Sequence, residues 1–193
     1  MAFVPDLRDI NSVCWSVCGQ YVYASSSRSS AILVHDVVFS KQSILKRAVW
    51  RGSSFLQIDS SGGYLFQILQ DSGLVIYNIA SRYQSLSVTT VAEISSIFQV
   101  PGCKGLIMFT FKGSSVINQM QVQKSPDGNV SIVTAPFLEI PAFEHMYGST
   151  TGLNIENAAM NSSGTKLVVQ FEGESVLGLF RVIRDPLPRF LAL

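Results

Sequence analysis

The chain has 193 residues, of which 47% are hydrophobic, so it can bury a substantial core. Its 14 lysine and arginine residues nearly balance its 13 aspartate and glutamate residues, which argues against a dedicated nucleic-acid or anionic-membrane surface, since such a surface needs a clustered basic excess. No apolar run approaches the ~20 residues of a membrane-spanning helix, so we expect neither direct nucleic-acid binding nor membrane insertion.

The apolar residues occur in short bursts between turns rich in serine and glycine, which is typical of β-strands. Four stretches share one template, in which a bulky residue precedes a turn glycine by four positions. The steps between these glycines are 43, 40 and 62 residues, and a repeat of about 40–45 residues is typical of a WD-type β-propeller blade. The four pairs are Trp15 and Gly19, Ile58 and Gly62, Phe98 and Gly102, and Met160 and Gly164. We expect the four bulky residues to occupy equivalent buried positions.

The first unit covers about residues 9–50. Its first strand alternates, with Val13 and Trp15 on one face and Cys14 and Ser16 on the other. A second strand is expected at 21–24, a polar loop at 25–30, a third strand at 31–37 and an outer strand at 43–49.

The second unit, about 51–92, has the turn 59–63, a hairpin at 71–73 and an outer strand at 85–91. The third unit, about 93–140, has a hairpin at 112–114 and an outer strand at 130–134. The fourth, about 153–193, ends in a strand at 175–183. An insertion at about 136–152 widens the last interval.

The predicted fold is therefore an all-β, WD-type β-propeller of about four antiparallel blades. Most WD-type rings need more than four blades. We therefore expect a partial ring that belongs to a longer chain.

Groups that could support catalysis are few. His35 fits a packed strand position and His145 a solvated loop, and the sequence contains no close His/Cys/Asp cluster for a metal. Cys14 and Cys18 are interpreted as small packing residues. No phosphate-binding glycine loop or nucleophile elbow occurs. We expect no catalytic activity, no cofactor and no metal.

The insertion supplies the candidate partner-binding residues Phe143, Met146 and Tyr147. Exposed aromatic and methionine side chains on a loop are natural anchors for another protein. The alternative is that they pack locally onto their own blade.

Two further features suggest where the protein acts. The first residues, 1–6, lack a basic segment followed by an apolar stretch, so we expect no secretory signal. The three cysteines, with Cys103 the third, cannot all pair with one another, which favours a reducing, intracellular compartment.

Three segments carry a family resemblance. They are residues 13–37 followed by Val49-Trp50-Arg51-Gly52, residues 55–65, and residues 161–186, which include Gly178-Leu179-Phe180-Arg181-Val182. Together they resemble the C-terminal half of the propeller in the Aladin family of WD-repeat nucleoporins. The resemblance implies a non-enzymatic component of the nuclear pore complex, held at the nuclear envelope through a transmembrane nucleoporin and supporting protein import. The turns depart from the family pattern where they lack a proline–aspartate pair, as in Val17-Cys18.

Two other readings stay open. One is a scaffold in a soluble cytosolic assembly, such as a translation-factor propeller that binds ribosomal surfaces, for which a strongly basic face would be evidence. The other is an enzyme that uses the central channel of the propeller, which would need a convergent set of histidine and acidic side chains.

Overall fold

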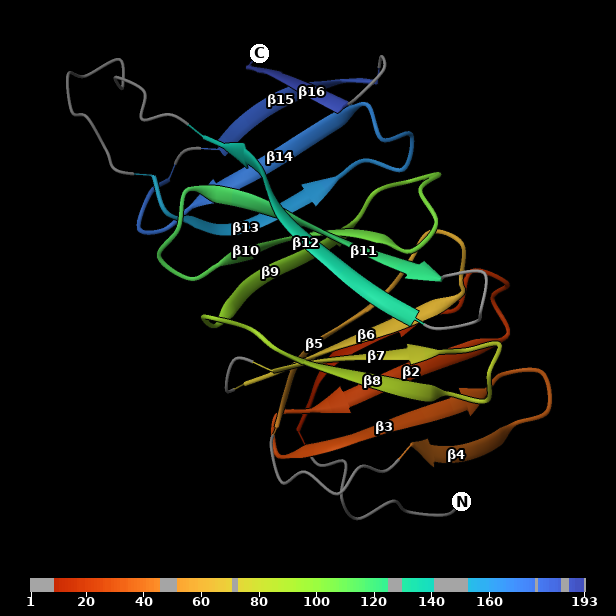
Figure 1. Ribbon diagram of the computed structural model, residues 1–193. Coiled ribbons are helices and arrows are strands. Elements are labelled where there is room, and N and C mark those ends of the chain that lie inside the picture. Colours follow the sequence, from red (N-terminus) through yellow and green to blue (C-terminus); the bar gives the residue numbers. More distant parts are fainter. Residues whose placement is uncertain are drawn as a thin grey trace. The chain divides into compact units, whose positions relative to one another are not determined.

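The computed structural model describes residues 9–45, 52–70, 73–124, 130–140, 153–175, 177–184 and 188–192, and these residues form sixteen β-strands and no helix (Figure 1). The strands make four four-stranded antiparallel sheets, each using four consecutive strands in chain order. None of the four sheets closes on itself within the described residues. The predicted all-β architecture of four antiparallel blades is confirmed.

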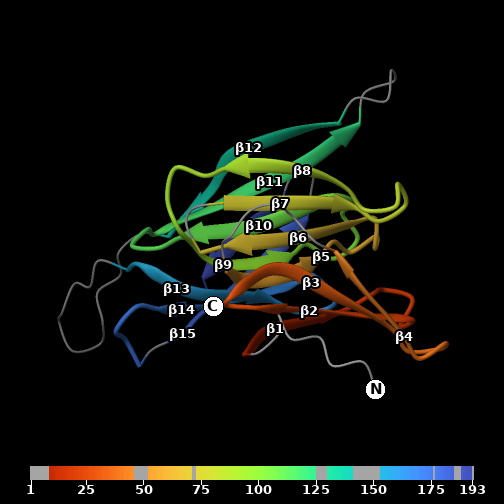
Figure 2. The ribbon, with the colours of Figure 1, turned by 90° about the horizontal axis from the view of Figure 1, so that it is seen from below.

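The chain divides into two compact units, Met1–Glu93 and Ile94–Leu193. The first unit holds two sheets, seen as separate twisted layers in Figure 2. Sheet 1 consists of β1 (Ile10–Trp15), β2 (Tyr21–Ser26), β3 (Ser29–Asp36) and β4 (Lys41–Leu45). Sheet 2 consists of β5 (Ser53–Ile58), β6 (Tyr64–Leu69), β7 (Gly73–Asn78) and β8 (Gln84–Thr89).

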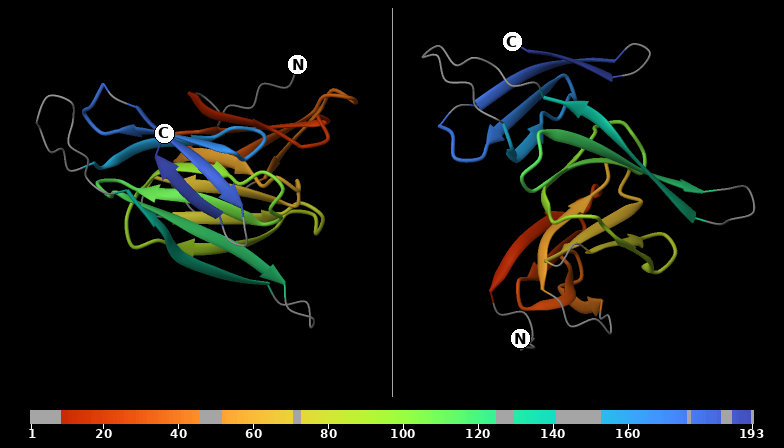
Figure 3. Two further views of the ribbon diagram at one scale, coloured as in Figure 1. Left: turned by 90° about the horizontal axis from the view of Figure 1, so that it is seen from above. Right: turned by 60° about the vertical axis from the view of Figure 1, so that its left-hand side comes forward.

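The second unit holds the other two sheets. Sheet 3 consists of β9 (Ile94–Gln99), β10 (Leu106–Phe111), β11 (Val116–Lys124) and β12 (Val130–Glu139). Sheet 4 consists of β13 (Ile155–Met160), β14 (Lys166–Phe171), β15 (Leu177–Arg184) and β16 (Pro188–Ala192). The β11–β12 hairpin is the longest in this unit and extends past the shorter β9 and β10 (Figure 3).

Several expected boundaries are corrected. The polar loop expected at 25–30 is only a two-residue turn, because β2 continues to Ser26 and β3 starts at Ser29. Serine suggested a loop here, yet Ser25 and Ser26 are buried in the strand, and the Ser25 hydroxyl lies 3.4 Å from Asn11 Oδ1. Strand β12 runs to Glu139, so residues 136–139 belong to sheet 3 and not to the insertion. Strand β16 was not expected.

Three of the turns between first and second strands share a polar residue that caps the next strand. Ser16, Asp59 and Asn161 each accept, at 2.8 Å, a side-chain hydrogen bond from the backbone N–H five residues later. In each turn the glycine N–H also donates to the carbonyl of this capping residue, three positions earlier. These glycines have φ between +65° and +73°, a conformation that other residues rarely adopt.

The third turn is built differently, and this changes which face its bulky residue occupies. Its backbone bond runs from Cys103 N to Val100 O, so Gly102 is the third residue of the turn instead of the fourth. A shift of one residue moves a side chain to the opposite face of a strand. Trp15, Ile58 and Met160 each directly precede their turns and are equivalent by register. The expectation that Phe98 is equivalent to them is wrong.

Each sheet therefore has two faces that can be compared between sheets. We call the side carrying Trp15, Ile58 or Met160 face A, and in sheet 3 the side carrying Gln99, which directly precedes its turn; the opposite side is face B. Directly paired residues project from the same side of an antiparallel sheet, so the register assigns every strand residue to one face. Face A of sheet 1 includes Val13, Trp15, Val22, Leu33 and His35, and its face B includes Cys14, Tyr23, Ile32 and Val34.

In the first unit, face B of sheet 1 packs on face A of sheet 2. Their buried cluster joins side chains of β2 and β3 to side chains of β5, β6 and β7; it comprises Tyr23, Ile32, Val34, Leu56, Ile58, Leu65, Leu69, Val75 and Tyr77. The Ser12 hydroxyl accepts a 2.9 Å hydrogen bond from Leu56 N across the two sheets. Gly52, which directly precedes β5, lies against the backbone of Ser27 in sheet 1. An added Cβ at this position would overlap the carbonyl oxygen of Ser27.

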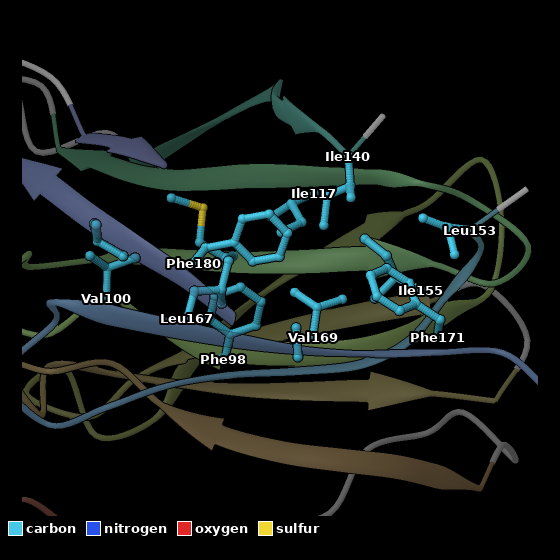
Figure 4. Close-up of a cluster of buried hydrophobic side chains, with 13 residues drawn as sticks. Phe98, Val100, Ile117, Ile140, Leu153, Ile155, Leu167, Val169, Phe171 and Phe180 are labelled. Carbon is cyan, nitrogen blue, oxygen red and sulfur yellow. The ribbon is translucent and has the colours of Figure 1, made fainter. Parts of the chain in front are cut away.

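The second unit repeats this arrangement, with face B of sheet 3 packed on face A of sheet 4 (Figure 4). Its buried side chains include Phe98, Val100, Met108, Ile117, Leu167, Val169, Phe171 and Phe180. Ser96 replaces Ser12 in the equivalent contact, and its hydroxyl accepts a 3.1 Å bond from Ala158 N. The same serine-to-amide bond thus joins the first strands of neighbouring sheets in both units.

Trp15 is the main exception to the predicted core, and Met160 is only partly buried against the core of the second unit. Trp15 is 56% exposed, whereas Ile58 at the same register is 5% exposed. Face A of sheets 2 and 4 packs on the preceding sheet, but no sheet precedes sheet 1 among the described residues. The residue type predicted burial, and the missing neighbour leaves the side chain open to solvent.

Candidate functional site

The predicted partner-binding residues Phe143, Met146 and Tyr147 lie outside the described residues, as does His145. The assignment of these three residues to partner binding stays a prediction. On either side of residues 141–152, Ile140 and Leu153 are both buried in the core of the second unit. Figure 4 labels both side chains within this cluster.

The described residues show little that could hold a metal. No three histidine, cysteine, aspartate or glutamate side chains gather there in a group that could bind an ion. His35 lies on β3 with its Nδ1 buried and, within the described structure, without a hydrogen-bond partner. In the same part of the chain, no helix has the length and apolar character needed to span a membrane.

The cysteines have different surroundings. Cys14 packs against the core of the first unit, and burial raises the pKa of its thiol to about 12. Cys18 is exposed in the β1–β2 turn, and its sulfur lies 3.3 Å from the Ser16 hydroxyl. That hydrogen bond lowers the Cys18 pKa. The packing role proposed from sequence therefore fits Cys14 but not Cys18.

The strongest candidate for a functional surface is a group of exposed apolar side chains at one end of sheet 1. Val17 lies in the β1–β2 turn, and Val37, Val38 and Phe39 lie in the β3–β4 turn. Their exposed fractions run from 42% to 68%. We call these four residues the apolar rim. Such side chains are costly to expose to water, and clusters of them mark sites where a protein binds another surface.

Hydrogen bonds hold the two turns of the rim together. Val37 N donates to Gln20 O at 2.8 Å, and Gln20 Nε2 donates to Asp36 Oδ2 at 3.1 Å. The other carboxylate oxygen of Asp36 accepts bonds of 3.0 Å from both Val38 N and Phe39 N. The side chains of the rim are thus presented by a backbone that is already ordered, which reduces the entropy lost on binding.

The rim extends toward sheet 2. A Cβ added to Gly62, in the β5–β6 turn, would lie 3.3 Å from Val17 Cβ. The turns of the two neighbouring sheets therefore meet at Val17, and the glycine leaves room for that side chain.

The sequence analysis missed the rim because it placed Val37 in a third strand at 31–37 and assigned no role to Val38 or Phe39. The available signal was Val37-Val38-Phe39 between Asp36 and Ser40. Three apolar residues in a segment too short to bury them indicate an exposed cluster. A turn was detectable at Asp36, whose carboxylate readily caps following amides.

No protein-family model and no curated protein sequence matches the chain. Solved structures do match it by fold. A chain of the mitotic checkpoint complex is 14% identical with a TM-score of 0.63, over 90% of this chain and 49% of that one. Hydrazine synthase from Kuenenia stuttgartiensis is 11% identical with a TM-score of 0.64, over 100% and 52%.

An auxiliary nutrient binding protein from Bacteroides thetaiotaomicron is 8% identical with a TM-score of 0.65, over 96% of this chain and 42% of that one. The chain thus spans about half the length of the solved structures it matches. At such low identity the likeness shows the fold alone, which is the predicted β-propeller type. One of the similar proteins is an enzyme by name, so the likeness does not decide between scaffold and catalyst.

Proposed function

We propose that this chain is a non-catalytic protein-interaction scaffold whose apolar rim anchors a partner. The observation that carries the proposal is the exposure of Val38 and Phe39 on a turn that Asp36 holds in place. Exposed apolar anchors on an ordered backbone are the usual centre of a protein interface. A partner that fits would place apolar side chains against the rim.

The proposed setting is the nuclear pore complex at the nuclear envelope, with pore components including a transmembrane nucleoporin as partners. This part rests on the resemblance of residues 13–37, 55–65 and 161–186 to the Aladin family. The propeller fold is compatible with such a role but is shared by proteins of many functions. The predicted anchors Phe143, Met146 and Tyr147 form a second candidate contact in this proposal.

The test compares tagged chains in cells by envelope staining and by recovery of bound proteins. Val38→Asp combined with Phe39→Asp should abolish partner recovery, because two carboxylates would be desolvated in the interface. Val91→Asp is the matched control, since Val91 is exposed outside the rim and its change should leave recovery intact. A triple alanine variant of the second candidate contact measures its share separately.

Each outcome bears on a different part of the proposal. Loss of partners in the rim variant, with a normal control, supports the rim as the anchor. Partner recovery that the rim variant does not reduce would refute it. Diffuse staining, or recovery of ribosomal proteins without pore components, would exclude the nuclear-pore setting and favour the cytosolic scaffold.

A further inference from the structure

The outer edge of sheet 2 differs from the outer edges of the other three sheets. The fourth strand of each sheet has no described strand on its outer side. Such edges are normally protected by charged residues or proline, which hinder pairing with another strand. Strand β4 contains Lys41, β12 contains Pro136 and β16 contains Pro188, whereas β8 contains neither a charged residue nor proline. The sequence of β8 is Gln-Ser-Leu-Ser-Val-Thr.

The backbone hydrogen bonds of sheet 2 determine which groups of β8 point outward. Residues of a central antiparallel strand bond alternately to the strand on one side and to the strand on the other. Ile79 N donates to Gly63 O, next to β6, at 3.0 Å. The preceding residue bonds toward β8, since Asn78 O accepts from Tyr83 N at 2.9 Å. This alternation directs the backbone N–H and C=O groups of every second residue of β8 away from β7; these residues are Ser85, Ser87 and Thr89.

The first strands are also edges, but neighbouring sheets use some of their outward groups. On β5, Leu56 N donates to the Ser12 hydroxyl, and on β13, Ala158 N donates to the Ser96 hydroxyl. In the part of the chain that the structure describes, no neighbouring sheet makes such a bond to β8. Three outward N–H groups and three outward C=O groups of β8 are therefore open to a partner.

The start of β8 is held in place by Tyr83. The ring of Tyr83 packs edge-on against that of Tyr23, with centroids 6.4 Å apart, and the two hydroxyl groups lie 3.3 Å from each other. Tyr83 also packs against the buried core of the first unit. The edge is thus ordered before any partner arrives, which lowers the entropy lost on binding.

The side chains along β8 define what a partner strand must look like. Ser85 and Ser87 lie on face A, whereas Leu86 and Val88 lie on face B, where Leu86 is 37% exposed. Directly paired residues share a face, so a partner strand fits best when its hydroxyl-bearing and apolar residues alternate. Arg82 is exposed at the start of β8 and supplies a positive charge for an acidic residue at that end of the partner.

We propose that β8 binds an extended segment of another protein, which adds to sheet 2 as a further antiparallel strand. Antiparallel addition continues the pattern of the whole sheet and lets each outward residue of β8 exchange both of its backbone bonds with one partner residue. The C-terminal end of the segment then lies beside Arg82 and carries the acidic residue. This surface is distinct from the apolar rim and does not rest on it.

The experiment measures binding of a fluorescein-labelled peptide, Thr-Val-Thr-Val-Thr-Val-Asp, by fluorescence polarisation. Its threonines would lie opposite the outward residues of β8, so their backbone N–H groups would donate to β8, whereas those of the valines would point away. N-methylation of the three threonines should weaken binding by about tenfold or more, because the donors are lost. N-methylation of the three valines is the matched control and should leave binding unchanged.

Variants of the chain test the same contact from the other side. Ser87→Pro removes one outward N–H that makes no bond to β7, so the sheet should survive and peptide binding should fall by about tenfold or more. Ser87→Ala keeps that N–H and should bind as the wild type does. Arg82→Glu should weaken binding of the peptide that ends in aspartate and favour the same peptide ending in lysine. Circular dichroism checks that each variant folds.

Val38→Asp, in the apolar rim, should leave peptide binding unchanged. Failure of the rim as an anchor and failure of the β8 edge as a strand-binding site are therefore distinguishable.

Three results would overturn the proposal. The first is no binding of the parent peptide by the wild-type chain up to the solubility limit of the peptide. The second is equal binding of the two N-methylated peptides, which would show that the contact does not use the backbone of a strand. The third is a doubled molar mass of the free chain that Ser87→Pro abolishes, which would assign the β8 edge to a second copy of the chain.

Discussion

Removing the Asp59 carboxylate should test whether a buried cap stabilises the β5–β6 turn. Asp59 is fully buried, and its carboxylate accepts bonds from Tyr64 N at 2.8 Å and Ser61 N at 3.2 Å. Asp59→Ala would leave the N–H of buried Tyr64 without this acceptor, whereas the polar groups of Ser61 could turn to water. A hydrogen bond to a charged group contributes about 1.5–3 kcal/mol, so we expect a loss of about 3 kcal/mol.

Ser16→Ala is the matched control because Ser16 caps Tyr21 N at the same distance of 2.8 Å with a neutral hydroxyl. Its expected cost is about 1 kcal/mol, typical of a neutral hydrogen bond. Asp59→Asn retains one carbonyl acceptor and should fall between the two. Urea unfolding followed by tryptophan fluorescence suits all three variants, since both tryptophans lie in residues 1–93. A cost for Ser16→Ala equal to or above that of Asp59→Ala would refute the reasoning.

Three further predictions concern the first unit. Ile58→Ala should cost about 2–5 kcal/mol, whereas Trp15→Ala at the same register should cost only about 1 kcal/mol because its side chain is mostly exposed; equal costs in urea titrations would contradict the assignment of faces. Iodoacetamide at neutral pH should alkylate Cys18 and should reach Cys14 only after unfolding. Only the thiolate reacts, and burial raises the pKa of Cys14 to about 12, so this thiol stays protonated in the folded chain. Peptide mapping that finds Cys14 alkylated before Cys18 would disprove this prediction. Gly52→Ala should cost at least about 2 kcal/mol, since its methyl would overlap a backbone carbonyl, and an unchanged melting temperature would contradict this close approach.

The number and type of the sheets were predictable because alternation and turn glycines are local signals. The repeated glycine spacing located the first hairpin of every sheet, including the one with the variant turn at Gly102. The face of Phe98 was not predictable from that spacing, because the glycine occupies a different place in its turn. The hydrogen bond from Cys103 N to Val100 O fixes where the turn begins, and therefore which face Phe98 occupies. This bond depends on three-dimensional geometry.

The exposure of Trp15 and the position of the candidate surface depended on non-local information. A tryptophan in an alternating strand favours burial, but burial also requires a neighbouring sheet on that side. The apolar rim depended on two turns meeting, and Gln20 and Asp36 lie 16 residues apart in the chain. Local patterns report which face of a strand is apolar, but they do not report what covers it.

The serine bonds between neighbouring sheets have a consequence for how such a chain tolerates change. Ser12 and Ser96 lie on the first strand of their sheets, and the bonds from Leu56 and Ala158 also come from first strands. The fourth strands β4 and β8 are largely exposed. Substitutions should therefore be tolerated least at the two serines and on buried inner strands such as β6 and β10, and most on β4 and β8. Because neighbouring sheets share side-chain contacts and no backbone ladder, a whole sheet is the natural unit of gene duplication and loss in this architecture.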